Sequence, residues 1–514
     1  MQSDIQKLAL EQVANFPKLF LDYLQDKEDL KNVYGRFPHI DNFKDQIKSK
    51  SFQHRATLVQ VLKEQYAHLP SAPNLDILQQ ENTFTVTTGH QLNIFTGPLY
   101  VIYKIVSTIN LAKVLSQKYP DYNFVPVYWM ATEDHDFEEI ASFFLFGTTY
   151  TWNTDQKGAV GEMDPSGLRE ILDQLREKPA VFEKAYTENA TLADAVRQYM
   201  HELFGQQGLV SIDGNHPALK QIFAPVVLEE LQTQVVKGKL EENASLLEQL
   251  GYKTLINPRE INLFYKTPGV RERIDYKDGI YTVLGTDMRF TLEEIKEELA
   301  QFPERFSPNV ALRPLYEEMI LPNLAYLGGP SELAYWLQLK GVFDHFKVTF
   351  PILLPRNLGL LVTESLKKRL DKLNVSVEEL YQDDVKLRKA FVDKHSENSL
   401  DLEKEVSALE QVFADILEKA ERIDPTLKGA IEAEKEKTVK GLGNLEARLK
   451  KAEERKFDTS IQQLLTVKDK LFPGGSQQER KDNFLNYALN DPQFLDKLFA
   501  AFDPLDFRFN VIYL

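Results

Sequence analysis

The pattern of hydrophobic and polar residues over positions 83–139 predicts one strand-helix-strand unit. The run TFTVTT (83–88) is β-branched and aromatic and stops at a glycine, which is typical of a short buried strand entering a turn. Pro98 then opens a helix, with apolar residues at helical spacing through Leu115. A second apolar strand, NFVPVYWMA (123–131), leads directly into the polar cluster TEDHD. The polar groups therefore follow strand ends, where open α/β sheets bind ligands.

Patterns outside this unit predict the rest of an α/β core and a small β insert. The strand GLVSID (208–213) resumes the sheet, and residues 261–286 alternate as in an antiparallel element. The core is expected to return at SPNVALRP (307–314) and to close with the apolar strand VTFPILLPRN (348–357). Strand, helix and strand again suggest a second half of the sheet.

The pattern changes between residues 400 and 471, where apolar stripes run through dense Lys and Glu. Asp424 and Pro425 interrupt the stripe, which indicates an antiparallel helical hairpin with coiled-coil character. Such a stripe requires a partner surface, either the other helix or a second subunit.

Composition narrows the class of protein. The chain has 514 residues, 43% hydrophobic and 27% charged, which suits a globular multidomain protein. Its net charge of −16 disfavours nucleic acid as a partner. No apolar run approaches the roughly 20 residues that span a bilayer, so we expect a cytoplasmic protein with no membrane partner. The absence of cysteine excludes disulfides, thiolate ligands and a cysteine nucleophile.

The first candidate cluster is the loop TGHQLNIFTGP, with Gly89, His90, Gln91, Thr96 and Gly97. We expect the loop to offer free backbone N–H groups at a helix N-terminus, and His90 to bond a phosphate oxygen there. The alternative is that His90 and Gln91 only cap a turn.

The second cluster consists of Glu133, Asp134, His135 and Asp136. Carboxylates here can bind an ammonium group, accept a proton from an attacking amine or hold Mg²⁺. Neighbouring residues of an extended segment point opposite ways, so all four cannot converge. The alternative for one of them is a helix cap. We expect no zinc site, because no second histidine stands at ligand spacing.

Two glycines before a proline form the third cluster, where Gly328 and Gly329 precede a helix. With Asn323 and Tyr326 they provide a candidate anion-binding turn, and a purely structural turn explains the pattern nearly as well.

The fourth cluster is Arg313, Arg356 and Asn357. Arg356 follows an apolar strand and suits bidentate recognition of an anion, with a structural salt bridge as the alternative. Lys104 is expected to be a surface or snorkelling lysine.

Several strings resemble the bacillithiol-synthesis cysteine-adding enzymes, a family of cysteine ligases (BshC), over essentially the whole chain. These are TGHQ, FTGPLYVIYK, PVYWMATEDHDFEEI, SPNVALRPLYEEMILPNLAYLGGPSELAYW, LLPRN and LFPGGSQQERKDNFL. The resemblance implies addition of L-cysteine to glucosaminyl-malate, on a Rossmann-like nucleotidyltransferase-type core with two connecting inserts and an α-helical antiparallel coiled-coil arm that pairs two subunits. Arg356 and the third cluster then become candidates for the malate or phosphate groups.

Amide formation from a free carboxylate requires an activated acyl group, so we expect ATP and Mg²⁺ to take part. We assign catalytic roles to His90, Asp134 and His135. The expected substrate- or nucleotide-binding residues are Gly89, Gln91, Thr96, Gly97, Glu133, Asp136, Asn323, Tyr326, Gly328, Gly329, Arg356 and Asn357.

The expected division of the chain has eight parts. They are an N-terminal helical region (1–80), the first half of the core (81–150), a helical insert (151–205), a core continuation (206–260), a β-containing insert (261–305), the second half of the core (306–375), the coiled-coil arm (376–480) and a C-terminal segment (481–514). Two other functions stay open, namely a different amide ligase of the same fold and a non-catalytic nucleotide-sensing scaffold.

Overall fold

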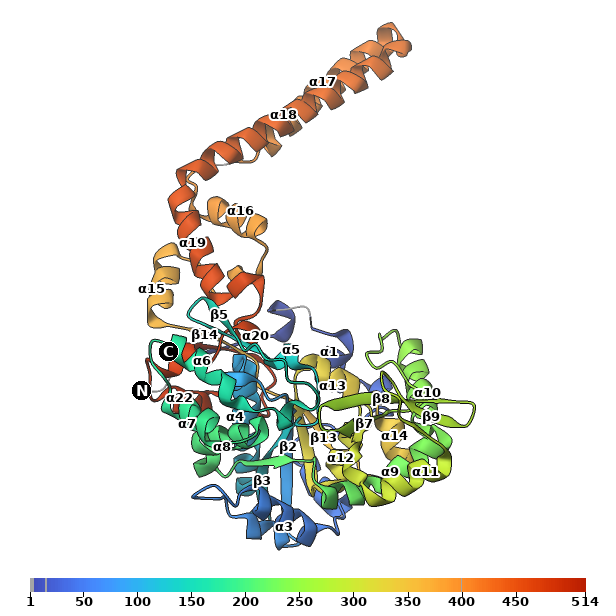
Figure 1. The fold of residues 1–514 in the computed structure, drawn as a ribbon. Coiled ribbons are helices and arrows are strands. Elements are labelled where there is room, and N and C mark those ends of the chain that lie inside the picture. The colour runs from blue at the N-terminus through green and yellow to red at the C-terminus, as the bar shows by residue number, and fades with distance from the viewer. Residues whose placement is uncertain (1–3, 14–15, 399) are drawn as a thin grey trace. The chain divides into compact units, whose positions relative to one another are not determined.

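The main sheet of the protein is five-stranded and parallel (Figure 1). The computed structural model describes residues 4–13, 16–398 and 400–514. The strands follow the order β13-β12-β2-β3-β6. Their bounds are β2 Thr83–His90, β3 Asn123–Met130, β6 Val210–Asp213, β12 Asn323–Gly328 and β13 Ile352–Pro355. The predicted α/β core is therefore confirmed.

Successive strands are added first on one side of β2 and later on its other side. From β2 the chain proceeds to β3 and β6 on one side, and it later returns to add β12 and β13 on the other. The carboxyl ends of β2 and β12 thus meet at the topological switch point. Because parallel crossovers are right-handed, α4 (Leu99–Lys118) and α13 (Pro330–Trp336) cover opposite faces.

Helix α4 is the central core helix. It is long and apolar enough to cross a membrane by length and composition, but 72% of that window is buried inside the protein. Its Ile102 and Ile109 belong to a large core with α8 and the C-terminal helices, whereas Leu111 and Leu115 pack in a second core with β12 and β13. Burial all round explains its weak amphipathicity.

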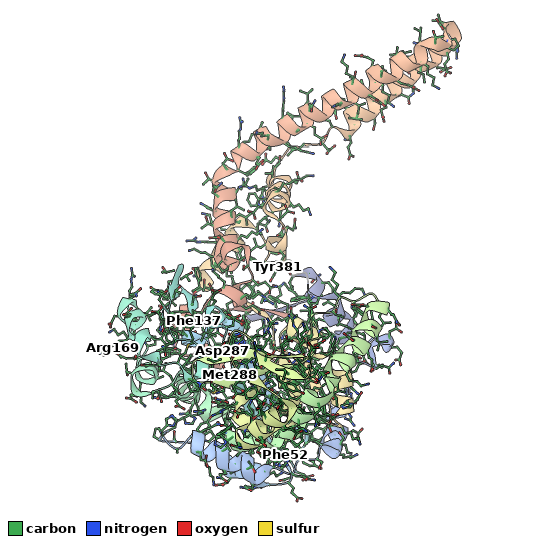
Figure 2. All side chains as sticks on the ribbon, turned by 45° about the vertical axis from the view of Figure 1, so that its right-hand side comes forward. Phe52, Phe137, Arg169, Asp287, Met288 and Tyr381 are labelled. Atoms are coloured by element: carbon green, nitrogen blue, oxygen red, sulfur yellow. The ribbon has the colours of Figure 1, made fainter. Side chains whose placement is uncertain are left out.

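The connection from β3 to β6 carries a hairpin and several helices. Its elements are α5 Phe137–Ile140, β4 Ser142–Leu145, β5 Thr148–Thr151, α6 Arg169–Gln174, α7 Ala180–Glu188 and α8 Leu192–Phe204. Phe137, labelled in Figure 2, meets Trp152 edge to face with 5.2 Å between ring centroids. Helix α5, which follows the second candidate cluster, is only one turn long, because β4 begins two residues after it ends.

A second, antiparallel sheet has the order β10-β9-β8-β7-β11. Its strands are β7 Leu263–Thr267, β8 Val270–Lys277, β9 Ile280–Val283, β10 Arg289–Phe290 and β11 Phe306–Pro308, and nearby helices are α9 Pro217–Thr233, α10 Val235–Gln249 and α11 Leu292–Gln301. The expected return to the core at 307–314 is wrong in its first residues, because Ser307 and Pro308 pair with β7. The main sheet resumes only at β12.

A third sheet, β1-β15-β14, was not expected from the sequence. It joins β1 Asp4–Leu8, β15 Phe509–Tyr513 and β14 Gly359–Val362. The predicted strand 348–357 is shorter, since β13 spans Ile352–Pro355 and the chain then enters β14. The remaining α-helices outside residues 362–475 are α1 Lys18–Leu24, α2 Asn42–Ser49, α3 Arg55–Gln65, α12 Arg313–Ile320, α14 Lys340–His345, α20 Gln478–Lys481, α21 Leu485–Ala488 and α22 Phe494–Ala501.

Residues 362–475 form a second compact unit together with Tyr513. Its helices are α15 Glu364–Leu373, α16 Asp384–His395, α17 Glu403–Ile423, α18 Lys428–Lys456 and α19 Asp458–Leu471. Helices α17 and α18 lie side by side as the orange hairpin of Figure 1, with Lys435 Nζ 3.1 Å from Glu410 Oε1. The predicted helical hairpin is confirmed.

Candidate active site

A cavity of about 1250 Å³ opens at the carboxyl edge of the main sheet. Its wall includes the ends of β2 and β12, the loop after β3, the residue after β13 and part of the antiparallel sheet. The switch point is where open α/β sheets bind ligands. The predicted site residues that line this cavity are Gly89, His90, Gln91, Asp134, His135, Asp136, Tyr326, Gly329 and Arg356.

His90 ends β2 and presents a buried ring nitrogen. Among the described residues, no group bonds its Nε2 atom. The ring packs edge to face on Tyr100, with 5.2 Å between centroids. Burial lowers the pKa of His90 to about 3, with help from Lys104 and Arg356. The imidazole is therefore neutral at physiological pH and keeps one nitrogen available to a ligand.

Two backbone N–H groups between the end of β2 and the start of α4 are used by the protein itself. The Phe95 N–H donates to the Tyr186 hydroxyl at 2.7 Å. The Leu99 N–H, in the first turn of α4, donates to the Asp482 carbonyl at 2.8 Å. The Leu99 N–H at the start of α4 is therefore not free, and the side chains of the cavity remain as candidates for binding anions.

Lys104 is buried, so the prediction of a surface or snorkelling lysine is wrong. Its ammonium donates to the Gly89 carbonyl at 2.7 Å and lies 2.6 Å from Glu332 Oε2. Glu332 also accepts from the Tyr326 hydroxyl and from the Gly329 N–H. Burial alone would raise the pKa of Glu332, but Lys104 and these donors hold it below the usual value. The pair joins the ends of β2 and β12.

Arg313 places a guanidinium among three aromatic rings. Its central carbon lies 6.0 Å from the Trp129 ring centroid, 5.7 Å from that of Tyr326 and 5.9 Å from that of Trp336. Nη1 donates to Glu317 at 2.7 Å. Burial raises the pKa of Glu317 to about 8, although Arg313 opposes this shift. Arg313 thus contributes a cationic group, paired with Glu317, to the wall of the cavity.

Arg356 lies at the carboxyl end of β13 in a buried ion pair. Its Nη2 and Nη1 atoms donate to Glu479 Oε1 and Oε2 at 2.7 and 3.1 Å. Its central carbon lies 5.3 Å from the Tyr100 ring centroid. The Nε atom is buried, and no described residue accepts from it. The structure thus contains the salt bridge that was the alternative for Arg356, and the same side chain lines the cavity.

Gln91 connects two carboxylates of the cavity. Its Nε2 donates to Asp134 Oδ2 and lies 3.5 Å from Glu139 Oε2. Burial would raise the pKa of Asp134, but the Gln91 amide, Arg271 and backbone N–H groups lower it. The pKa of Glu139 is raised by burial and by the negative charges of Asp134 and Asp136. Neighbouring carboxylates whose pKa values are driven apart are typical of separate roles in catalysis.

His135 is held by an arginine from the antiparallel sheet. Arg271 Nη1 lies 2.6 Å from His135 Nδ1, and its Nε donates to Ser307 Oγ at 3.1 Å. The guanidinium lies 4.0 Å from the Phe264 ring centroid. Because arginine only donates, Nδ1 must accept, which leaves the proton of the neutral imidazole on Nε2. His135 therefore presents an N–H donor.

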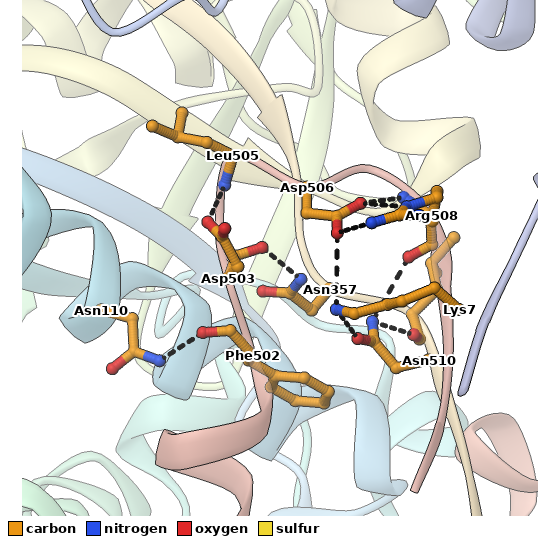
Figure 3. A network of polar contacts seen from close by, with 10 residues as sticks. Lys7, Asn110, Asn357, Phe502, Asp503, Leu505, Asp506, Arg508 and Asn510 are labelled. Carbon is orange, nitrogen blue, oxygen red and sulfur yellow. Dashed lines mark hydrogen bonds and ion pairs between the residues drawn. The ribbon is translucent and has the colours of Figure 1, made fainter. Parts of the chain in front are cut away.

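Three predicted binding residues lie away from the cavity lining and serve the fold. Glu133 lies 2.5 Å from the buried Lys220 ammonium. Asn323 stands at the start of β12, where Thr87 donates to its side-chain oxygen at 2.8 Å. The Asn357 amide donates to the Asp503 carbonyl at 2.7 Å, in the network of Figure 3.

The other three predicted residues outside the lining shape the backbone. Thr96 and Gly97 have φ of 67° and 61° and form the turn before α4. Gly328 ends β12, and its carbonyl accepts from the Arg356 N–H at 2.9 Å. A Cβ at this glycine would approach Leu333 to 3.0 Å.

Sequence reasoning missed Glu139, Arg271 and Arg480, which also line the cavity. Glu139 follows the EDHD cluster by a single turn, and that spacing was the available signal. Arg271 lies within a strand of the insert, where nothing local distinguishes it from a surface arginine. Arg480 lies in the LFPGGSQQERK string of the family resemblance and was not singled out.

Arginine side chains make part of the cavity suited to anions. Among the described residues, no group of three or more His, Asp or Glu side chains comes together to hold a metal ion. Arg356 supplies a buried donor without a partner, and Arg313 supplies positive charge. These side chains fit the phosphate groups of a nucleotide or the carboxylates of a substrate.

The strand order and the cavity at its switch point define a Rossmann-like α/β protein of the ligand-binding class. Residues 4–357 match the family described as Bacillithiol biosynthesis BshC, N-terminal Rossmann-like domain, and residues 359–514 match its C-terminal coiled-coil domain. The chain belongs to the BshC family of bacillithiol biosynthesis.

Curated relatives extend over almost the full chain. A protein of Christiangramia forsetii is 44% identical over 520 residues, covering 97% of each chain. One of Cytophaga hutchinsonii is 41% identical over 510 residues, covering 98% of each. Both carry the name "Putative cysteine ligase BshC".

Proposed function

We propose that this protein joins the carboxyl group of L-cysteine to the amine of glucosaminyl-malate in an ATP-dependent reaction, as the last step of bacillithiol biosynthesis. The observation that carries the proposal is a single cavity lined both by cationic groups and by carboxylates with separated pKa values. The family name of the relatives supports cysteine as one substrate.

The cationic part of the cavity suits the acidic groups of the reactants. Arg313 and Arg356 line it, with the neutral His90 ring beside them. Carboxylates of malate and phosphates of ATP both take charge-assisted hydrogen bonds from guanidinium groups. Activation of the cysteine carboxyl places a phosphoryl leaving group on it, and these residues would offset the charge that develops there.

The carboxylate part suits ammonium binding and proton transfer. Asp134, whose pKa is lowered, stays ionised and would bind the cysteine ammonium. Glu139, whose pKa is raised, is the better proton acceptor. When the amine nitrogen of glucosaminyl-malate attacks the activated carbonyl, its proton passes to Glu139 and the phosphoryl oxygen leaves with the electron pair.

His135 would act as a hydrogen-bond donor in this scheme. Arg271 occupies its Nδ1 atom, so the Nε2–H is the ring donor left for a ligand. A donor near the reacting carbonyl stabilises the negative charge that develops on oxygen. Gln91 would position both carboxylates through its amide nitrogen.

Homodimerisation through the coiled-coil hairpin and a cytoplasmic location complete the proposal. Apolar side chains on the hairpin face solvent, with Val412 53%, Ile416 40% and Leu445 50% exposed. A second copy of the hairpin offers a matching apolar stripe.

The test is mass-spectrometric detection of bacillithiol after incubation of the purified protein with glucosaminyl-malate, L-cysteine, ATP and Mg²⁺. Each component is omitted in turn, and serine replaces cysteine in one arm. We expect product only in the complete mixture, with AMP or ADP identifying the activated intermediate. His90→Ala and Asp134→Ala should abolish product while leaving the folded state intact.

Product with another amino acid but not with cysteine would point to a different amide ligase. Nucleotide binding without product under any condition would contradict the ligase proposal and favour a nucleotide-sensing scaffold.

A further inference from the structure

The C-terminal segment that follows the coiled-coil hairpin supplies a buried carboxylate to the cavity region. Glu479 lies in α20, and both it and Arg356 are almost completely buried, with side-chain exposures of 1% and 2%. The Glu479 carboxylate accepts hydrogen bonds from the Nη1 and Nη2 atoms of Arg356 and from the Gly359 N–H, the last at 3.1 Å. Every oxygen of Glu479 therefore has a partner.

The position of Glu479 is fixed by its neighbours. The Gln478 side chain accepts from the Leu361 N–H at 2.8 Å and donates to the Leu361 carbonyl at 3.0 Å, as a paired strand would. The Asn483 amide donates to the carbonyls of Phe95 and Gly97, each at 2.7 Å. Residues 478–483 are thus anchored on both sides of the arginine.

This arrangement leaves one nitrogen of Arg356 without an acceptor among the described residues. Nη1 and Nη2 are committed to Glu479, with Nη1 also donating to the Asn357 carbonyl at 3.1 Å. The buried Nε has no acceptor among the described residues. A buried donor without a partner is costly, and a ligand oxygen in the cavity would satisfy it.

We propose that Glu479 is a positioning residue, which holds both terminal nitrogens of Arg356 so that its Nε–H donates to an oxyanion of the reactants, a carboxylate or a phosphate. The inference rests on the proposed function for the identity of the reactants. It assigns to the segment after the arm a direct part in building the site. Because Arg356 and Glu479 offset each other in charge, recognition depends on a directed N–H group more than on net charge.

Equilibrium binding tests this inference without turnover. L-Malate and ATP with Mg²⁺ are titrated separately by calorimetry into full-length wild type, Glu479→Gln, Arg356→Lys and the double variant. We expect Glu479→Gln to weaken binding of at least one probe tenfold or more. The affected probe shows whether the oxyanion is a malate carboxylate or a nucleotide phosphate.

A matched control separates positioning from general loss of a buried ion pair. Glu318 pairs with Lys50 at 2.7 Å and is equally buried, but it bonds Asn323 at the opposite edge of the main sheet. Glu318→Gln should lower the thermal midpoint in a comparable way and leave both affinities within twofold of wild type.

The double variant tests whether Glu479 acts through Arg356. We expect Glu479→Gln with Arg356→Lys to bind no more weakly than Arg356→Lys alone, because the same contact is already lost. Additive effects would contradict a positioning role. If Glu479→Gln does not fold, Glu479→Asp replaces it in both the single and the double variant, since it keeps the charge and withdraws the carboxylate from Arg356.

Unchanged affinity for both probes in the folded variants would overturn the inference, as would a wild-type protein that binds neither probe. Wild-type binding that depends on Glu479, in a protein that forms no bacillithiol, would instead support the positioning role and count against the ligase proposal.

Discussion

The Lys104 ammonium lies 2.6 Å from Glu332 Oε2 in the interior of the protein and joins the two strands that meet at the switch point. Lys104 comes from α4, which follows β2, and Glu332 from α13, which follows β12. The Lys104 contact with the Gly89 carbonyl and the Glu332 contact with the Gly329 N–H extend the pair to both strand ends. The ion pair thus links two strand ends in the wall of the cavity.

Replacement of Lys104 by methionine should destabilise the protein by about 3 kcal/mol, because Glu332, whose side chain is only 19% exposed, then lacks its cation. Urea unfolding measures the loss. Lys118→Met on the same helix is the matched control, since Lys118 pairs with Asp41 in an exposed ion pair. An exposed pair contributes at most about 1 kcal/mol. Equal losses in the two variants would contradict a structural role for the buried pair.

The two carboxylates beside Gln91 should respond differently to conversion into amides. In the proposed ligase reaction, Asp134→Asn should raise the KM for cysteine, whereas Glu139→Gln should lower kcat about 10²-fold or more, the usual scale for general-base catalysis. The raised pKa of Glu139 gives the sign of the pH effect. Activity should fall as the pH decreases through this pKa, because the protonated carboxyl cannot accept a proton.

Steady-state kinetics across pH 5 to 8 measures both effects. In Glu139→Gln, the acid limb assigned to this carboxyl should disappear from the remaining activity. A Glu139→Gln variant with wild-type kcat would assign proton transfer to another group.

The first strand-helix-strand unit was predictable because each of its elements has a signal in its own local sequence. β2 is β-branched and ends at a polar loop, and α4 has Pro98 immediately before it. Lys104 could not be placed in this way. Its long stem on an apolar helix is equally suited to snorkelling. Its burial depends instead on pairing with Glu332, which lies 228 positions away in the chain.

Within the cavity, too, some residues could be placed from local sequence order and others only from long-range packing. His90 ends β2 and Asp134 lies in the loop after β3, so the topology of the parallel sheet alone brings them to one edge. Arg271 reaches His135 from an antiparallel strand whose docking depends on packing that the local sequence does not specify. Asn323 has the right strand but stands at its first residue, where the side chain supports the opposite edge.

Gly97 combines positive φ with a close contact, and the two effects can be separated. Its φ is 61°, and a Cβ would lie 2.6 Å from Asn93 Cβ. Gly147 has φ of 84° with nothing within 4 Å of a Cβ. Gly147→Ala should cost about 1–2 kcal/mol from backbone strain alone, and Gly97→Ala should cost clearly more. Chemical unfolding compares the two, and equal losses would show that the Asn93 contact relaxes.

The hairpin stripe should control the oligomeric state. Leu445 and Ile416 are half-exposed on α18 and α17. If the stripe forms the proposed dimer interface, Ile416→Glu with Leu445→Glu should convert dimers into monomers in sedimentation velocity. Val385→Glu, on α16 and 77% exposed, is the control and should leave the sedimentation coefficient unchanged. A wild-type protein that sediments as a monomer at micromolar concentration would contradict the dimer.

Asp482 should make the protein less stable as the pH rises. Its side chain is buried, and its Oδ2 accepts from the Tyr487 hydroxyl at 2.7 Å. Burial raises its pKa from 3.8 to about 6, although Tyr487 opposes the shift. The folded state therefore holds this proton more tightly than the unfolded state does. The resulting stabilisation is complete below about pH 4 and is lost as the pH rises through about 6.

Replacement of Asp482 by asparagine removes the ionisation and keeps an oxygen for Tyr487. A shift of about two pKa units corresponds to about 3 kcal/mol, so Asp482→Asn should exceed wild type in unfolding free energy by up to that amount at pH 8. The advantage should shrink towards pH 5, where the wild-type carboxyl is largely protonated. Urea unfolding at both pH values measures the difference, with the exposed Asp155→Asn as control. An advantage that is the same at both pH values would mean that Asp482 is not the titrating group.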